Sequence, residues 1–301
     1  MPARTHRFLA TVAILAAVLT AFFAAATPAN AAPHYLVLAN LGQGIAASTP
    51  NPAGSPAGVN VSSCQPSAAH PRPVVLITGT FGNMIDDWSG LGPTLANRGY
   101  CVYSTVIGGS PSSLIQTIGA VATSAAQIGT FVNQVRSRTG AAQVDLVGHS
   151  QGGLIGEYYL KNLNGASKVH SFVGLSPTTH GTTLDGLALL GKAFGITDVI
   201  GAACPACGDQ VPGSAVVTAL NAGPVAQPGV SYTIIETRNE FVVTPAGTAA
   251  FIAEPGVTNT WVQNSCPFDA VDHASLSYDK GVYDLVDNAL DPAHPQPVHC
   301  F

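Results

Sequence analysis

The sequence has 301 residues, of which 47% are hydrophobic and only 9% are charged, and its formal net charge is −5. This length and composition fit one compact domain with a large apolar interior and a surface of mostly uncharged polar residues. Its 11 lysines and arginines form no basic cluster, so its charge does not favour nucleic acid or an anionic lipid as a partner.

The first 31 residues have the pattern of a secretory signal peptide. Arg4 and Arg7 precede an apolar stretch over Phe8–Ala26, and Pro28–Ala31 places small residues where a signal peptidase cuts. An uncleaved membrane anchor is the alternative, but the short stretch and its small-residue ending favour cleavage after Ala31. No later segment is long and apolar enough to cross a bilayer, so we expect a secreted, extracellular protein.

All six cysteines lie beyond the signal peptide, where an oxidising environment favours three disulfides. Pairing each cysteine with its nearest partner predicts Cys64–Cys101, Cys204–Cys207 and Cys266–Cys300. Half of a zinc site or a redox centre is the alternative for Cys204-Pro205-Ala206-Cys207. No second pair at ligand spacing and no thioredoxin-like pattern accompanies it, so we expect no metal.

The predicted elements begin after a lead-in over 32–70, which is rich in proline, serine, alanine and glycine and is expected to be extended and loosely packed. Val74–Ile77 is apolar on both faces, which is typical of a central strand in a parallel sheet. A helix is predicted over Asp86–Arg98 with Gly99 as its cap, and Tyr100–Val106 is predicted to be the next strand.

Apolar residues at helical spacing predict one long amphipathic helix from Leu114 to about Arg138. Val144–Val147 and Val169–Leu175 predict two more strands, with a helix over Leu154–Leu160 between them. Strands that alternate with helices define an α/β fold, in which a mostly parallel central sheet carries helices on both faces.

This alternation stops after Leu175 and resumes with a strand at Val230–Ile235. We interpret the interval, at about 176–229, as a small cap or lid excursion from a catalytic domain over 71–301. The alternative is that its leucines simply pack on the core. Three further elements are predicted, namely a helix over 245–253, a strand over 258–262 and a closing helix over 276–290.

A candidate nucleophile lies in Gly148-His149-Ser150-Gln151-Gly152, between a predicted strand and a predicted helix. A serine on so tight a turn has a strained backbone, and its flanking positions must be glycine because a side chain there would strike the neighbouring strand or helix. The amides and dipole of the following helix would stabilise negative charge near Ser150. Gly-x-Ser-x-Gly arises readily by chance among 32 glycines, so the strand-turn-helix context carries the prediction.

A serine hydroxyl needs an imidazole to take its proton and an acid to hold that imidazole, in the chain order serine, acid, histidine for folds of this kind. Four histidines follow the strand at 169–175, namely His180, His273, His294 and His299. The last two belong to a proline-rich tail, whereas His273 lies in a loop between the last strand and the last helix. We therefore predict His273 as the general base.

Glu240 is the preferred acid because it lies a few residues beyond the strand at 230–235. Glu236 is the nearest rival, but it adjoins the strand and is expected to point along the sheet. Asp272 ranks lower because neighbouring side chains in a chain diverge from each other.

The oxyanion hole is predicted to use the backbone amide of Gln151 and one from the turn Thr78–Gly82. Thr80 is the preferred residue in that turn because its hydroxyl adds a third donor. The alternative is an ordinary glycine-rich turn without such a role.

Four motifs resemble, in matching order, those of secreted bacterial class 2 lipases and, more distantly, of the fungal lipase B type. They are Thr78-Gly79-Thr80, Ser150-Gln151-Gly152-Gly153-Leu154, Glu240-Phe241-Val242-Val243-Thr244-Pro245 and Val271-Asp272-His273-Ala274. The resemblance runs from about Val74 to the C-terminus. It implies an α/β-hydrolase fold, hydrolysis of triacylglycerols and other carboxylic esters, a threonine and a glutamine in the oxyanion hole, stapling disulfides and no metal or other cofactor. The family pattern usually has aspartate where this chain has Glu240.

The leading hypothesis is a secreted serine hydrolase that forms an acyl-enzyme on Ser150. The charge-poor interval at 176–229 favours lipid esters, which implies transient contact with a lipid interface. A short-chain esterase, a polyester esterase or an acyltransferase with the same triad fits the same residues. A catalytically silent scaffold that binds a lipid or protein is the alternative from another class. We expect a monomer.

Overall fold

The computed structural model of the chain describes residue 1, residues 34–194 and residues 203–300. Most of the predicted signal peptide, with its cleavage site at Ala31, and the segment 195–202 of the predicted cap lie outside the described residues. Within the described ranges, no helix is both long enough and apolar enough to cross a membrane.

Six strands form one parallel sheet in the order β2-β1-β3-β4-β5-β6. They are β1 (Val74–Ile77), β2 (Val102–Ser104), β3 (Val144–His149), β4 (Val169–Leu175), β5 (Ser231–Glu236) and β6 (Val257–Trp261). Each one overlaps a predicted strand, so the sequence pattern located the whole sheet. The reversal of strand order at β1 and β3 is the place where open α/β sheets form a crevice beyond the carboxyl ends of their strands.

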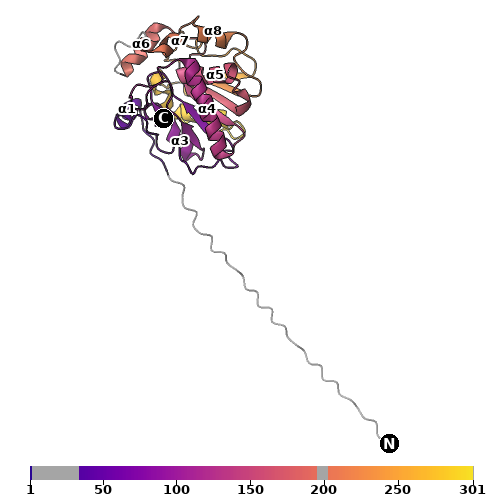
Figure 1. The fold of residues 1–301 in the computed structure, drawn as a ribbon. Helices are drawn as coiled ribbons and strands as arrows, with labels where there is room; N and C mark the ends of the chain where they lie inside the picture. The colour runs from indigo at the N-terminus through magenta and orange to yellow at the C-terminus, as the bar shows by residue number, and fades with distance from the viewer. Residues whose placement is uncertain (2–33, 195–202, 301) are drawn as a thin grey trace. The chain divides into compact units, whose positions relative to one another are not determined.

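The helices cover both faces of this sheet, as predicted (Figure 1). They are α1 (Leu41–Ser48), α2 (Met84–Trp88), α3 (Leu91–Asn97), α4 (Val121–Thr139), α5 (Gln151–Asn162), α6 (Leu184–Ala193), α7 (Pro205–Asp209), α8 (Ala215–Asn221), α9 (Val262–Ser265) and α10 (Lys280–Leu290), with short 3₁₀ turns η1 (Ala166–Lys168) and η2 (His273–Tyr278). Successive residues of a strand point to opposite faces, and this alternation builds two hydrophobic clusters.

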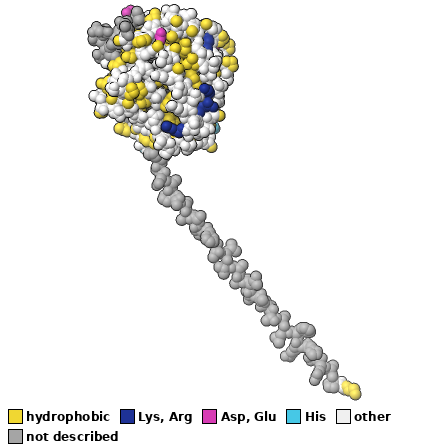
Figure 2. All heavy atoms as spheres, viewed as in Figure 1, with side chains coloured by type: hydrophobic (Ala, Val, Ile, Leu, Met, Phe, Trp, Pro, Cys, Tyr) yellow, Lys and Arg dark blue, Asp and Glu magenta, His cyan; other side chains and the backbone are white. Residues whose placement is uncertain are grey.

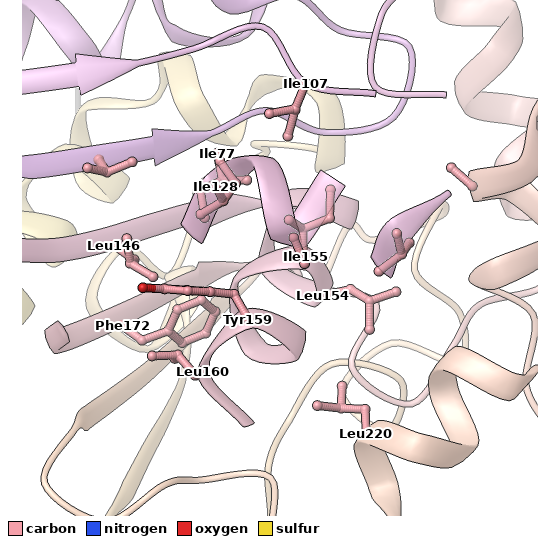
Figure 3. Close-up of a cluster of buried hydrophobic side chains, with 14 of the residues drawn as sticks. Ile77, Ile107, Ile128, Leu146, Leu154, Ile155, Tyr159, Leu160, Phe172 and Leu220 are labelled. Atoms are coloured by element: carbon pink, nitrogen blue, oxygen red, sulfur yellow. The ribbon is translucent and has the colours of Figure 1, made fainter. Parts of the chain in front are cut away.

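In β1, Val75 and Ile77 belong to the cluster under α4 and α5, whereas Val74 and Leu76 belong to the cluster under α3 and α10. Figure 3 shows part of the first cluster, in which Tyr159 of α5 lies beside Phe172 of β4. Burial on both faces is why a central strand such as β1 is a continuous apolar run, whereas the edge strand β6 is partly exposed and mostly polar. On the face drawn in Figure 2, charged side chains are few and scattered among polar and hydrophobic atoms, in keeping with the 9% charged composition.

All three nearest-partner disulfides are confirmed: Cys64–Cys101, Cys204–Cys207 and Cys266–Cys300. The described residues contain no free cysteine. The first bond fastens the segment before the sheet to the start of β2, and the last fastens the C-terminal tail to the end of α9.

The prediction of an extended lead-in over 32–70 is wrong, because it contains helix α1. The side chain of Asn40 caps this helix by accepting a hydrogen bond from the amide of Gln43 at 3.0 Å. Gly44 then lets α1 lie against the core, since a Cβ there would stand 2.1 Å from the hydroxyl of Tyr278. This contact with a distant residue is a tertiary effect that a local pattern does not reveal.

Two predicted helices differ from those in the structure: one begins later than predicted, and the other is interrupted. Residues 114–120 are not helical, and α4 begins only at Val121, because the positive φ of 54° at Thr117 turns the chain back against the segment after β2. The predicted helix over 86–98 is two helices, α2 and α3. They divide near Gly90, where a Cβ would stand 2.4 Å from the hydroxyl of Tyr283.

Two predictions near the C-terminus also need correction. Residues 245–253 form turns instead of a helix, and the left-handed φ of 77° at Gly247 brings the chain against Trp261. The predicted helix over 276–290 begins as the 3₁₀ turn η2. Its α-helical part, α10, starts at Lys280, where the side chain of Asp279 accepts a hydrogen bond from the amide of Val282 at 2.9 Å.

Candidate active site

The predicted site residues all follow the carboxyl ends of strands, so they meet at one edge of the sheet. Thr80 follows β1, Ser150 follows β3, Glu240 follows β5 and His273 follows β6. A backbone bridge between Asn239 and Asp272 holds the loops of the last two side by side. Ser150, Thr80 and His273 line one pocket at this edge.

Ser150 sits in the strained conformation predicted for it, with φ 54° and ψ −126°. The flanking glycines are required: a Cβ on Gly148 would stand 2.5 Å from the carbonyl oxygen of Gly152, and one on Gly152 would stand 2.0 Å from that of Ile77. The Ser150 hydroxyl is buried and makes no hydrogen bond within the described part of the chain. Ser150, at the N-terminus of α5, therefore has a strained backbone and a hydroxyl without a hydrogen-bond partner among the described residues, a combination that is common at functional sites.

His273 is paired with Glu240 across a buried hydrogen bond, with 2.7 Å between Nδ1 and Oε2. Both side chains are fully shielded from solvent. Glu240 Oε1 accepts hydrogen bonds from the amides of Val242 at 2.7 Å and Val243 at 2.9 Å. Burial by itself raises the pKa of Glu240, but His273 and the two amides outweigh burial and lower it below its usual value. Glu240 is therefore ionised and oriented toward the imidazole.

The remaining nitrogen of His273 is available for chemistry. Nε2 is buried and has no hydrogen-bond partner among the described residues, and it belongs to the same pocket as Ser150. Catalytic hydrogen bonds are often long in the absence of substrate and tighten in the complex. Ser150 Oγ and His273 Nε2 are not hydrogen-bonded to each other in this structure, so a proton can pass between them only once that bond forms.

The two rival acids have other contacts. Glu236 is the last residue of β5, and its Oε2 accepts a hydrogen bond from the amide of Gly247 at 2.8 Å. Burial and then the nearby Glu240 raise the pKa of Glu236 to about 8, which keeps this carboxyl neutral at pH 7. Asp272 caps η2 by accepting a hydrogen bond from the amide of Ser275. Neither one is hydrogen-bonded to the His273 ring.

Thr80 lies against the start of α5. Its hydroxyl donates to Gln151 Oε1 at 2.7 Å and accepts a hydrogen bond from Gln210 Nε2 at 3.0 Å. The orientation of the Gln210 side chain is fixed as well. Its Nε2 also donates to the carbonyl oxygen of Ala206 at 3.2 Å, and a carbonyl oxygen can only accept a hydrogen bond. Gln210 was not singled out from the sequence, since its 130-residue separation from Thr80 leaves no local signal.

A second histidine–carboxylate pair, Asp87 and His149, lines the same pocket and was also missed by the sequence analysis. His149 Nδ1 is 2.7 Å from Asp87 Oδ1, and His149 Nε2 is 3.0 Å from the carbonyl oxygen of His273. Asp87 lies in α2, 62 residues away in sequence. The only sequence signal was the position of His149 immediately before Ser150.

Apolar side chains close the pocket on the side of the predicted cap. Leu190 of α6, Phe194 and Leu41 of α1 line it beside Ser150. Leu187 and Leu190 are buried within the core cluster. This agrees with the alternative prediction that the leucines of the interval at 176–229 pack on the core. The cap itself stays a prediction, since part of it lies outside the described residues.

A parallel sheet with a strained serine after β3 and a carboxylate–histidine pair after β5 and β6 is the architecture of the α/β-hydrolases. Within this class the chain belongs to the class 2 lipase family, whose model, described as Lipase (class 2), matches residues 71–275. Solved structures agree on the fold. Aspergillus fumigatus lipase B superposes with a TM-score of 0.59 at 18% identity, over 78% of this chain and 56% of that one. Mature Bacillus licheniformis lipase BlEst2 gives 0.54 at 17% identity, over 75% and 94%.

Two curated relatives share a shorter stretch. Triacylglycerol lipases from Pseudarthrobacter phenanthrenivorans and Burkholderia plantarii are each 35% identical over 96 residues, which is 30% of this chain. The match spans 28% of the first relative and 25% of the second, so only about a quarter of their length is represented.

Proposed function

We propose that this chain is a secreted serine hydrolase of carboxylic esters, and of lipid esters in particular. The observation that carries the proposal is the His273–Glu240 hydrogen bond of 2.7 Å. This bond directs the Nδ1 proton toward the carboxylate, and Nε2 has no hydrogen-bond partner in the part of the chain that the structure describes, although His273 lines the pocket of Ser150. An imidazole in this tautomer is the base that a serine hydroxyl requires.

In the first half of the proposed reaction, Ser150 Oγ bonds to the ester carbonyl carbon while His273 Nε2 takes the hydroxyl proton. Ionised Glu240 stabilises the imidazolium that results. The tetrahedral intermediate then expels the alkoxide, which takes the proton from Nε2 and leaves as the alcohol. In the second half, water loses its proton to Nε2 and attacks the acyl-enzyme, and Ser150 recovers the proton as the carboxylic acid leaves.

The negative oxygen of the intermediate would be stabilised by the backbone amides of Gln151 and Thr80 and by the Thr80 hydroxyl. Gln151 is the first residue of α5, where backbone amides lack helical partners and the dipole favours negative charge. The Thr80 hydroxyl accepts a hydrogen bond from Gln210 and donates its own proton to Gln151 Oε1 at 2.7 Å, so this proton would have to turn from Gln151 to the oxyanion when the intermediate forms. Preorganised donors of this kind are each typically worth about 10²–10³ in kcat.

Lipid esters are proposed as substrates on two grounds. Leu41, Leu190 and Phe194 give the pocket an apolar wall next to Ser150, and the curated relatives are named triacylglycerol lipases. An apolar wall holds an acyl chain by removing its surface from water. Short-chain esters, polyesters and acyl transfer remain competing outcomes of the tests below.

A fluorophosphonate probe tests the nucleophile directly. The parent is expected to take up one label per chain, and Ser150→Ala is expected to take up none and to lose hydrolysis of p-nitrophenyl esters. Ser124→Ala is the matched control, since Ser124 is also a buried serine without a hydrogen-bond partner among the described residues but lies in α4. The proposal fails if folded parent is not labelled or if Ser150→Ala retains the parent's rate.

Substrate class and secretion need separate measurements. Rates on p-nitrophenyl esters of rising chain length, with and without an oil interface, are expected to favour long chains at the interface. A preference for acetate in free solution would instead indicate an esterase. Full-length expression is expected to release a product whose N-terminus is Ala32, and recovery of the uncut chain in the membrane would contradict secretion.

A further inference from the structure

The Asp87–His149 pair has no part in the proton transfers above, although both residues line the pocket of Ser150 and His273. The side chains of both residues are 7% exposed, and the rings of His149 and His273 lie with their centroids 5.0 Å apart. Buried polar groups must be hydrogen-bonded to be tolerated. Here every nitrogen and oxygen of the pair has a partner.

The partners determine where the protons are. The carbonyl oxygen of His273 can only accept, so His149 Nε2 must carry a hydrogen. Asp87 Oδ2 accepts a hydrogen bond from the amide of Gly79 at 2.8 Å. A second proton must then lie between His149 Nδ1 and Asp87 Oδ1, since two bare acceptors 2.7 Å apart would repel each other. The pair therefore holds two protons in all, one on each ring nitrogen of His149 or one shared with Asp87.

These three hydrogen bonds join the three segments on which the proposed chemistry depends. Gly79 belongs to the turn that presents Thr80, His149 immediately precedes Ser150, and the accepting carbonyl belongs to His273 itself. The packing is close as well: a Cβ on Gly79 would stand 3.2 Å from both the Ser150 Cβ and the His149 carbonyl oxygen. A shift in any one segment is thus transmitted to the other two.

We propose that Asp87 and His149 are positioning residues. They set the distances among Ser150, His273 and the oxyanion turn, which is the turn Thr78–Gly82. This proposal rests on the proposed function, because it assigns the pair a task within that same site. The pair acts through its hydrogen bonds and neither gives nor takes a proton in the proposed reaction. Misplacement of reacting groups by about 1 Å is enough to cost about 10²-fold in rate.

The competing explanation is that the pair acts on the site through its electric charge. Several titratable groups surround the pair. Asp86 lies on the same helix, Glu240 and His273 approach from the loops after β5 and β6, and Tyr278 of η2 faces Asp87. Burial by itself lowers the pKa of His149, but Asp87, the His273 carbonyl and Glu240 together outweigh burial and raise it above its usual value. Protonated His149 and ionised Asp87 together carry no net charge. A variant that removes these charges but keeps the hydrogen bonds therefore separates an electrostatic role from a positioning role.

Three variants make that separation. His149→Phe keeps a ring but loses both hydrogen bonds, and it is expected to lower kcat about 10²-fold with KM within about threefold of the parent. Asp87→Leu is expected to match it. Asp87→Asn keeps an acceptor for the Gly79 amide and donates to a neutral His149, so it is expected to lose less than about tenfold. The proposal is overturned if folded His149→Phe retains the parent's kcat, or if Asp87→Asn is as impaired as Asp87→Leu.

Proton NMR provides a measurement that does not depend on activity, with variants serving to assign the signal. A low-field resonance from the proton between His149 and Asp87 is expected, and it should be absent from His149→Phe and retained in Ser150→Ala. Its absence from the parent would overturn the proton assignment. Failure of the proposed function would look different, because Ser150→Ala would then keep its activity whatever the state of this pair.

Discussion

Replacing Glu240 with glutamine tests the base and its acid together. The amides of Val242 and Val243 hold an acceptor atom at Oε1, so the glutamine oxygen takes that place and its NH₂ group faces His273 Nδ1. An NH₂ group donates, which forces the imidazole proton onto Nε2. Nε2 then no longer accepts the Ser150 proton.

The size of the effect follows from the lost charge pair. Two unit charges 2.7 Å apart, the Nδ1–Oε2 distance, interact by about 6 kcal/mol at an effective dielectric constant of about 20. Since about 1.36 kcal/mol corresponds to a factor of ten in rate, Glu240→Gln is expected to lower kcat/KM by about 10⁴-fold. Glu240→Asp keeps the charge but is one methylene shorter, so a smaller loss is expected.

The assay is hydrolysis of p-nitrophenyl butyrate at pH 7, with active sites titrated by a fluorophosphonate. Glu236→Gln is the matched control. Glutamine preserves the acceptor for the Gly247 amide, and Glu236 is already neutral because its pKa is raised to about 8. Its rate is expected to stay within about twofold of the parent. The reasoning is refuted if Glu240→Gln loses less than tenfold, or if Glu236→Gln falls as far.

Three further predictions concern the oxyanion turn, pH and the C-terminal tail. Thr80→Val is expected to lower kcat about 10²-fold with little change in KM, and Thr80→Ser to restore most of it; equal losses would contradict a role for the hydroxyl. Burial raises the pKa of Glu157 from 4.5 to about 8, so the folded protein keeps a proton that the unfolded chain releases, and stability falls as pH rises across this range. Glu157→Gln should therefore flatten the drop in Tm between pH 5 and pH 8, and an unchanged drop would count against this cause. The double variant Cys266→Ser, Cys300→Ser opens a loop with a sequence separation of 34 and is expected to lose about 4 kcal/mol of unfolding free energy in urea, with activity per folded molecule retained.

The local sequence pattern was enough to predict the sheet, the strand-turn-helix at 148–152 and the disulfides of this protein. Apolar runs marked the central strands because a parallel sheet is buried on both faces there, so these strands need no alternation with polar residues. The edge strand β6 is the exception, since it is mostly polar and partly exposed. The turn at 148–152 was found from its local strand-turn-helix pattern. Gly148 is required by a local contact with Gly152, whereas Gly152 is required by a tertiary contact with Ile77 of β1. Ser150, Glu240 and His273 were predicted from chain order at a strand's end, and their roles stay predictions to be tested by the variants above.

Tertiary structure decided what no short stretch contains. Helix α1 depends on Gly44 meeting Tyr278, and the chain before α4 turns back at Thr117 to pack against the segment after β2, so helical spacing was misleading at 114–120. Asp87 and Gln210 reach His149 and Thr80 across 62 and 130 residues of chain. Hydrogen bonds over such separations exist only once the strands have aligned their carboxyl ends, because it is the sheet that brings their loops together.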